Sequence, residues 1–426
     1  MKKMLSRVLV FTLALMLSNA IVVNAYDDSD FWRNHDRSME IVHILFESFA
    51  LEDVRGVSGY PDYFGGLYID DDGNLVLLLV VDTSFGFSQF DASLDTSFVR
   101  MGYFEGISLR EVQFAFSELS HVMDMLDDII DNAEECKAAR NASRWSLDVV
   151  GNRILVNLLE FSSESIALFE ANVFSSPAIV FQPCDGRVID IWDAILELNY
   201  TSPPYAPPPA LTRSVVSVRP GDHIYVWRPN LMTNPRTYTF VGSGSVGYLA
   251  TNDAFGRGFV TAAHLSTALS GVHLRYGDLV GTSTDRLGRA RLVWDQTVDA
   301  AFVQLYSNVV WNGTTPNGEV SQVIAPPVVG SRVQFVGSGP GHRRGTSGPI
   351  TEIRASHHFS AIGLTIRNVI VWRSDASLVG GDSGGLTHSL SAAGVRGISG
   401  IIVGRVGSYG LTIQASEINS RLRLQL

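Results

Sequence analysis

Cysteine is scarce in this chain of 426 residues, which contains only Cys136 and Cys184. In an oxidising compartment the two thiols could form one intramolecular disulfide, or they could remain two buried thiols, and both alternatives are open. Two cysteines lack the number and spacing of a zinc site, and residues 70–72, three aspartates in a row, lack the alternating ligands of a calcium loop. We therefore expect no bound metal and no cofactor.

Lysine is absent from residues 211–426, which carry their positive charge on arginine alone. This half contains 19 Arg against 11 Asp plus Glu, a net charge of about +8, so the total of −11 leaves about −19 for residues 1–210. Drift in composition is one interpretation, and binding of an acidic N-terminal domain to a basic C-terminal domain is the other. The arginines are scattered, with Arg343 and Arg344 the only adjacent pair, so we expect no nucleic-acid partner.

Long apolar runs are absent except at the N-terminus. Basic residues at the start precede a largely apolar run at 8–23, and residues 23–25 form a small-x-small cleavage site before an acidic segment. This pattern predicts a secretory signal over residues 1–25 and a secreted protein with no membrane association after signal removal. An uncleaved membrane anchor is the alternative, but Ser18 and Asn19 interrupt the apolar run.

Residues 26–198 are predicted to form an α/β domain. Apolar spacing predicts a helix over 30–51, and strand, turn and strand patterns predict β-hairpins over 64–80 and 145–158. A capping box at 108–111, followed by apolar residues three and four apart, predicts a second helix over 109–137. The two units resemble a degenerate internal repeat of helix plus hairpin.

A proline-rich linker at 199–212 separates this domain from an all-β region at 213–426. Short β-branched and aromatic runs between turn residues predict a sandwich or barrel in this second region. The predicted strands are 223–227, 236–241, 246–250, 258–262, 290–294, 300–305, 332–336, 350–354, 364–372 and 398–403.

Three polar residues of the all-β region have the residue types and contexts of a nucleophilic site. Ser383 lies among four glycines at 380–385, and glycine leaves the hydroxyl accessible and backbone N–H groups free to face an oxyanion. His264 ends an apolar strand, and Asp299 begins another, where its carboxylate can be buried against an imidazole. Asp295 in the same loop is the alternative to Asp299, but it lies further from the apolar run.

These motifs resemble those of the chymotrypsin-like serine peptidases. The matching strings are Thr261-Ala262-Ala263-His264, Asp299-Ala300-Ala301-Phe302-Val303 and Gly381-Asp382-Ser383-Gly384-Gly385. The resemblance implies a double six-stranded β-barrel, a catalytic triad of His264, Asp299 and Ser383, and an oxyanion hole formed by the N–H groups of Gly381 and Ser383. Ser377 matches the floor of the specificity pocket, with Leu378 and Val379 beside it.

The residues of that pocket favour cleavage after an apolar or small residue, because no carboxylate stands at Ser377; Asp375, two residues earlier, is the competing charge. The strand that binds substrate backbone is expected within 398–404. Both Ser399-Gly400 and Val403-Gly404 match its key positions.

Two departures from the family pattern concern cysteine and the mature N-terminus. Leu265 stands where a cysteine usually follows the catalytic histidine, and no Ile-Val-Gly-Gly-like start follows the linker. The charge partner of Asp382 is therefore unassigned, and an arginine could take that part, as in bacterial streptogrisin and α-lytic relatives. Those relatives carry a large N-terminal pro-region that assists folding and inhibits the product, and residues 27–198 resemble one in position, size and layout.

The sequence thus predicts a monomeric, secreted serine endopeptidase that acts on polypeptides and is made as a precursor. Its N-terminal domain would serve as intramolecular chaperone or inhibitor. Self-cleavage is expected within 203–212, where the bonds after Tyr205 and Leu211 suit an apolar pocket. The alternative is a non-catalytic, protease-like binding protein whose acidic domain covers the cleft.

Overall fold

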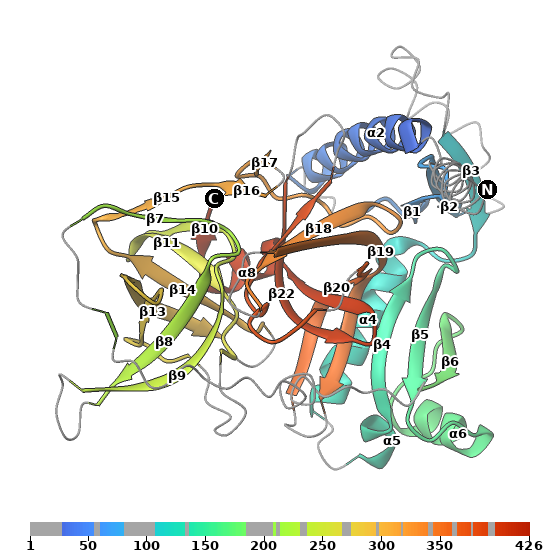
Figure 1. Cartoon of the computed structure of the whole chain (residues 1–426). Coiled ribbons are helices and arrows are strands. Elements are labelled where there is room, and N and C mark those ends of the chain that lie inside the picture. The colour runs from blue at the N-terminus through green and yellow to red at the C-terminus, as the bar shows by residue number, and fades with distance from the viewer. Residues whose placement is uncertain are drawn as a thin grey trace, which may run out of the picture.

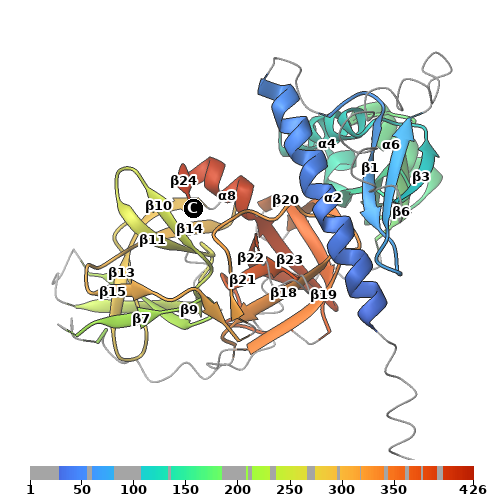
Figure 2. The same ribbon diagram turned by 90° about the horizontal axis from the view of Figure 1, so that it is seen from above.

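The computed structural model comprises three bodies in a row, namely two β-sheets of the C-terminal half and an N-terminal α/β part (Figures 1 and 2). The predicted signal, Asp295, Ser377 and most of the linker lie outside the described residues, among which no helix has the length and apolarity to cross a membrane. The described residues are 28–54, 60–80, 107–132, 136–184, 208–209, 214–230, 237–265, 274–294, 298–316, 318–339, 344–359, 364–375, 378–390 and 397–426.

The N-terminal part begins with helix α2 (Asp28–Val54), which includes the predicted helix over 30–51. Ile41, Leu45 and Phe49 are buried on one face of α2, as their spacing predicts. The predicted hairpin is present as the antiparallel strands β1 (Phe64–Ile69) and β2 (Leu75–Val80), and a third strand, β3 (Ile107–Val112), pairs parallel with β2.

The predicted helix start at 108–111 is wrong. These residues belong to β3, with Leu109 paired to Leu77 and Arg110 to Leu78, and the helix α4 (Phe116–Asn132) begins several residues later. The apolar spacing that predicted the helix does bury Leu119, Met123 and Leu126. A capping box is a local signal, and here pairing with a distant strand overrides it.

The second N-terminal unit repeats the plan of the first. Strands β4 (Ala142–Asp148) and β5 (Arg153–Leu158) form the predicted antiparallel hairpin, and β6 (Ile179–Pro183) pairs parallel with β5. The short helix α5 (Lys137–Arg140) precedes the hairpin, and α6 (Ser163–Asn172) connects β5 to β6. Cys136 and Cys184 are both free thiols of intermediate burial, with no disulfide between them.

The first C-terminal sheet has the order β24-β10-β11-β14-β13-β12-β8-β9. Its strands are β8 (His223–Pro229), β9 (Tyr238–Ser245), β10 (Leu249–Asn252), β11 (Gly256–Thr261), β12 (Leu279–Gly281), β13 (Arg286–Trp294), β14 (Ala300–Leu305) and β24 (Leu424–Gln425). The backbone pairing leaves β9 and β24 at the ends of this sheet, so a closed six-stranded barrel stays a prediction here.

The second C-terminal sheet contains a closed ring of six strands, because β18 pairs with β21 on one side and with β19 on the other. In ring order the strands are β18 (Arg332–Gly337), β21 (Leu386–Ser389), β22 (Ile398–Val406), β23 (Tyr409–Gln414), β20 (Leu364–Arg373) and β19 (Arg344–Phe359). Each of the ten strand segments predicted for the C-terminal half overlaps a strand of one sheet or the other.

Smaller elements complete the C-terminal half. They are β7 (Val216–Val218) paired with β15 (Val309–Trp311), the hairpin of β16 (Thr314–Thr315) and β17 (Gly318–Glu319), and helix α8 (Ala415–Leu422). The sequence patterns did not predict α8, β12, β21 or β23.

The N-terminal part is joined to the second sheet by backbone pairing and by a shared core. Strand β4 pairs antiparallel with β19, which places Trp145 opposite Ser356, and the N–H of Ile69 donates to the carbonyl oxygen of Val329 at 2.8 Å. One buried apolar cluster includes residues of α2, β2 and β4 together with Phe335 and Trp372. The sheet of the second body therefore continues into the N-terminal part.

Opposite charges meet at this contact. The acidic face of α4 lies against β19 and β20, with Asp124 paired to Arg354 at 2.5 Å and Asp128 paired to Arg367 at 3.8 Å. Asp127 is buried between them. It accepts hydrogen bonds from Trp145 Nε1 at 2.7 Å and Ser356 Oγ at 2.8 Å. Acidic residues of the N-terminal half therefore pair with basic residues of the C-terminal half across their contact.

Candidate active site

Two neighbouring strands of the first sheet position His264 and Asp299. β11 ends at Thr261, three residues before His264, and β14 begins at Ala300, directly after Asp299. Thr261 and Ala301 are register partners, so the two polar residues leave the same end of the sheet side by side. Both side chains are buried, which removes the competition of water for their hydrogen bonds.

The structure brings His264, Asp299 and Ser383 together. Asp299 Oδ2 hydrogen-bonds to His264 Nδ1, and His264 Nε2 lies 2.9 Å from Ser383 Oγ. The second carboxylate oxygen of Asp299 accepts the backbone N–H groups of Ala263 at 3.0 Å and His264 at 2.9 Å. The carboxylate is thus fixed by three donors. The imidazole faces the serine hydroxyl with the nitrogen that could take its proton.

Ser383 lies on a tight loop that requires glycine on both sides. Gly381 has φ +89° and Gly384 has φ +84°, values in the left-handed region that favours glycine. A Cβ on Gly384 would lie 2.1 Å from Thr261 Oγ1 of the first sheet. The loop is therefore pressed against β11, the strand that leads to His264.

The N–H groups of Gly381 and Ser383 donate to no acceptor in the described part of the chain, whereas the intervening N–H of Asp382 donates to the carbonyl of Val379. Two unused donors, one on the candidate nucleophile itself and one two residues before it, match the requirement for binding an oxyanion. The Asp382 carboxylate, whose partner the sequence left open, accepts the N–H groups of Gly339 and Val379, each at 2.9 Å.

The candidate specificity residues lie on one side of this loop. Leu378 is buried and Val379 is half-buried, while Ser377 lies outside the described residues. Strand β22 reaches the loop at Ile402, whose carbonyl accepts the N–H of Gly384 and whose N–H donates to the carbonyl of Gly385. Of the two alternatives for the substrate-binding strand, Val403-Gly404 comes directly after this contact.

Leu265, the departure from the family's cysteine, packs in the interior against Gly244. It is 1% exposed, and a Cβ on Gly244 would lie 2.3 Å from Leu265 Cδ2. Apolar packing therefore fills the space beside the histidine in the absence of cysteine.

Sequence reasoning missed three residues at the nucleophile loop (residues 380–385): Ser245 and Ser338, which hydrogen-bond to it, and His223, which hydrogen-bonds to Ser338. Ser245 Oγ donates to the carbonyl of Gly381 at 2.7 Å, Ser338 Oγ lies 2.9 Å from Ser245 Oγ, and His223 Nδ1 lies 2.8 Å from Ser338 Oγ. They come from three segments that are distant in sequence, and no local motif marks them. Only the tertiary structure brings them together.

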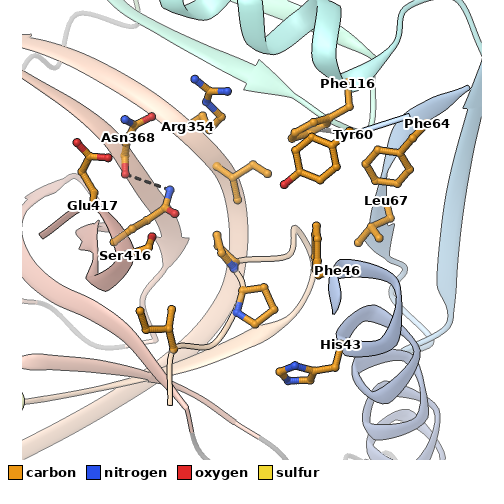
Figure 3. Close-up of a pocket in the computed structure, with 15 residues that line it drawn as sticks. His43, Phe46, Tyr60, Phe64, Leu67, Phe116, Arg354, Asn368, Ser416 and Glu417 are labelled. Atoms are coloured by element: carbon orange, nitrogen blue, oxygen red, sulfur yellow. Dashed lines mark hydrogen bonds between the residues drawn. The ribbon is translucent and has the colours of Figure 1, made fainter. Parts of the chain in front are cut away.

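A separate cavity of about 600 Å³ lies between the N-terminal part and the second sheet (Figure 3). One wall is mainly aromatic and comes from the N-terminal part, and the opposite wall comes from the C-terminal half and combines polar side chains with isoleucine and proline. None of the three candidate catalytic residues lines it. The aromatic residues are Phe46, Tyr60, Phe64 and Phe116, and the polar residues include Arg354, Asn368, Gln414, Ser416 and Glu417.

Two protein-family models match the N-terminal part of the chain. The Pro-like N-terminal domain matches residues 29–101, and the Pro-like C-terminal domain matches residues 117–183. These matches confirm the predicted resemblance of this part to a protease pro-region. No curated protein sequence matches the chain.

Several solved structures of bacterial proteases resemble about half of this chain. Thermobifida fusca protease A has 19% identity and a TM-score of 0.37, covering 50% of this chain and 98% of its own. Nocardiopsis protease has 24% identity and a TM-score of 0.36, and the match covers 50% of this chain and 99% of that protease. Cellulomonas bogoriensis chymotrypsin has 23% identity and a TM-score of 0.35, and the match covers 49% of this chain and 98% of that protein.

Proposed function

We propose that this protein is a secreted, chymotrypsin-like serine endopeptidase made with an N-terminal pro-region. The observation that carries the proposal is the contact of His264 Nε2 with Ser383 Oγ at 2.9 Å, with Asp299 on the other ring nitrogen. A histidine between a buried carboxylate and a serine hydroxyl is the arrangement of nucleophilic acyl transfer. The matches to pro-region models support the precursor.

In the proposed reaction Ser383 Oγ attacks the carbonyl carbon of the scissile peptide bond while His264 Nε2 takes the hydroxyl proton. Asp299 holds the imidazole in the Nδ1–H tautomer and stabilises the imidazolium. The N–H groups of Gly381 and Ser383 bind the oxyanion, and His264 then gives its proton to the leaving amine. Water, deprotonated by the same histidine, hydrolyses the acyl-enzyme and restores Ser383.

Substrate choice in this proposal follows from Ser377, which carries no charge, and the apolar side chains of Leu378 and Val379 beside it, which favour an apolar or small residue before the scissile bond. Substrate backbone would pair with β22 at Val403-Gly404, because Ile402 anchors that strand to the nucleophile loop. The linker cleavage at 203–212 would be the first turnover of the enzyme. Sequencing the N-terminus of the secreted protein tests it, and a mature start outside residues 200–223 would contradict it.

Labelling of the expressed chain with a fluorophosphonate probe tests the catalytic assignment. We expect the wild type to be labelled and to hydrolyse peptides, and Ser383→Ala to lose labelling and at least about 10⁴-fold in turnover. Ser420→Ala, at an exposed serine of α8, is the matched control and should keep both. A folded wild-type protein that takes no label would instead support a non-catalytic binding protein. A Ser383→Ala precursor that still matured alone would assign the cleavage to another protease.

A further inference from the structure

Ser245 contacts the nucleophile loop at both ends of the segment that carries the two oxyanion donors. Its Oγ donates to the carbonyl of Gly381 at 2.7 Å, and its backbone N–H donates to the carbonyl of Ser383 at 2.8 Å. Ser245 is the last residue of β9 and is completely buried. The first sheet therefore fixes the backbone of the loop from Gly381 to Ser383.

Ser338 and His223 complete this contact from two other strands. Ser338 follows β18 of the second sheet, and its N–H donates to Ser245 Oγ at 2.9 Å. Its own Oγ lies 3.3 Å from the carbonyl of Gly381 and 3.2 Å from that of Gly244. His223 opens β8 as the register partner of Ser245, and its Nδ1 faces Ser338 Oγ. The two sheets thus meet behind the loop through polar side chains.

The hydrogen atoms of this group can be assigned by counting donors and acceptors. His223 Nε2 is buried and has no hydrogen-bond partner among the residues that the structure describes. A proton on Nε2 would be an unsatisfied buried donor, so the proton belongs on Nδ1, which donates to Ser338 Oγ. Ser338 Oγ–H is then free to donate to the carbonyl of Gly381 or Gly244, and Ser245 Oγ–H donates to Gly381. In this arrangement every hydrogen of the group has an acceptor.

The same geometry keeps the imidazole of His223 neutral. An imidazolium would place a second N–H at Nε2, where no described residue offers an acceptor, and burial lowers the pKa of His223 to about 4. The ring also packs edge-on against Tyr225, with 4.7 Å between centroids. His223 therefore acts as a fixed neutral donor at neutral pH.

We propose that Ser245, Ser338 and His223 are positioning residues that hold the peptide between Gly381 and Ser383 in the orientation that directs both N–H groups at the oxyanion. The inference rests on the proposed function, since it concerns the oxyanion hole of that reaction. The oxyanion develops in the transition state and the tetrahedral intermediate and is absent from intact substrate, so these residues should affect turnover and not the binding of intact substrate.

Ser245→Ala in the full chain, allowed to mature, is the primary test. It removes the shorter hydrogen bond to Gly381, and we expect kcat per labelled active site to fall about 10- to 100-fold with KM changed less than about twofold. The affinity for a peptide boronate, which forms a tetrahedral adduct at the serine, should fall by the same factor. Thr315→Val is the control. It removes a buried hydroxyl that donates a hydrogen bond to the carbonyl oxygen of Gly318 at 2.8 Å in the β16–β17 hairpin, and it should leave kcat, KM and the boronate affinity unchanged.

Substitutions of His223 and Ser338 keep the proposal testable if Ser245→Ala does not accumulate. His223→Asn retains an N–H near the position of Nδ1 and should keep kcat within about threefold, whereas His223→Leu should lower kcat by about tenfold, as should Ser338→Ala. A merely structural role would lower the thermal midpoint of His223→Asn and His223→Leu alike without separating their kcat values.

Two outcomes would overturn the inference while leaving the proposed function intact. One is a Ser245→Ala enzyme whose kcat and boronate affinity match those of the wild type, and the other is an equal loss for His223→Asn and His223→Leu. A wild-type protein that neither hydrolyses peptides nor binds the boronate would overturn the proposed function itself.

Discussion

Single residues of the nucleophile loop have almost no free space around them. Gly384 shows this most directly, because a Cβ there would meet Thr261 Oγ1 at 2.1 Å and the backbone nitrogen of Ala262 at 2.7 Å. Gly256 has a similar positive φ of +72°, but apart from its chain neighbours no heavy atom of the described residues lies within 4 Å of its Cβ position. The two glycines therefore separate the cost of a left-handed backbone from the cost of a steric clash.

Gly384→Ala and Gly256→Ala form a matched pair for measuring these costs. We expect Gly256→Ala to lower the free energy of unfolding by about 1 kcal/mol, the cost of a left-handed conformation for alanine. Gly384→Ala should lower it by at least about 3 kcal/mol, because backbone must also move. Urea unfolding in a Ser383→Ala background measures both without self-digestion, and equal values for the two variants would contradict the tight packing of the loop.

At the scale of elements, α4 and β4 attach the N-terminal part to β19. Asp127 lies at the centre of this contact, where burial raises the pKa of its carboxyl group despite the hydrogen bonds from Ser356 and Trp145. A raised pKa in the folded state means that the ionised form costs stability at higher pH. That cost disappears as the pH falls through the folded-state pKa and the carboxyl group is protonated.

Substitutions of Asp127 test this contact. Asp127→Leu leaves two buried donors without an acceptor and should lower the free energy of unfolding by about 2–4 kcal/mol. Asp127→Asn keeps an acceptor oxygen without the charge, so it should cost less than about 1 kcal/mol and flatten the acid end of the stability profile. Asp124→Asn, at a side chain 62% exposed, is the control and should cost less than about 1 kcal/mol at neutral pH. If Asp127→Leu is as stable as Asp124→Asn, the carboxylate does not organise the contact.

Elements were predictable from sequence where a local pattern agreed with the tertiary contacts. The hairpins of β1–β2 and β4–β5 are closed by short turns that contain Gly-Asn and their strands bury most of their apolar residues, so their periodicity and turn residues sufficed. Residues 108–111 have a helix-start pattern, yet they form β3 because β2 offers a parallel partner. Parallel pairing joins residues far apart in sequence, and no short window contains that information.

At the scale of the whole molecule, the acidic and basic halves meet through partly exposed ion pairs around a shared apolar core. Arg354 and Arg367 face α4, and Arg144 of β4 pairs with Glu352 of β19. Exposed pairs of this kind contribute less than about 1 kcal/mol each, whereas burial of apolar residues contributes most of the stability of such a contact. Salt should therefore weaken the association of the halves without abolishing it.

This expectation can be measured on a Ser383→Ala chain cut at a protease site introduced into the linker. We expect the dissociation constant of the two parts to rise about tenfold between 0.05 M and 1 M salt, corresponding to a loss of 1–2 kcal/mol from screened pairs. The double variant Asp124→Asn, Asp128→Asn should reduce this rise, and Glu170→Gln, at an exposed residue of α6, should not. Association independent of salt would contradict a role for the charge difference.

The sequence alone determined the residue types on which the proposed chemistry depends: a serine among glycines, a histidine and an aspartate at strand ends, and an acidic domain ahead of a basic all-β half. These features are short-range, because residue type and local periodicity carry them. The tertiary structure alone decided that the serine, the histidine and the aspartate are in contact and that the backbone N–H groups of Gly339 and Val379 hydrogen-bond to the Asp382 carboxylate. It also decided that Ser245, Ser338 and His223 form a hydrogen-bonded group at the carbonyl of Gly381. Such contacts depend on how two sheets pack, and packing joins segments that no local pattern relates.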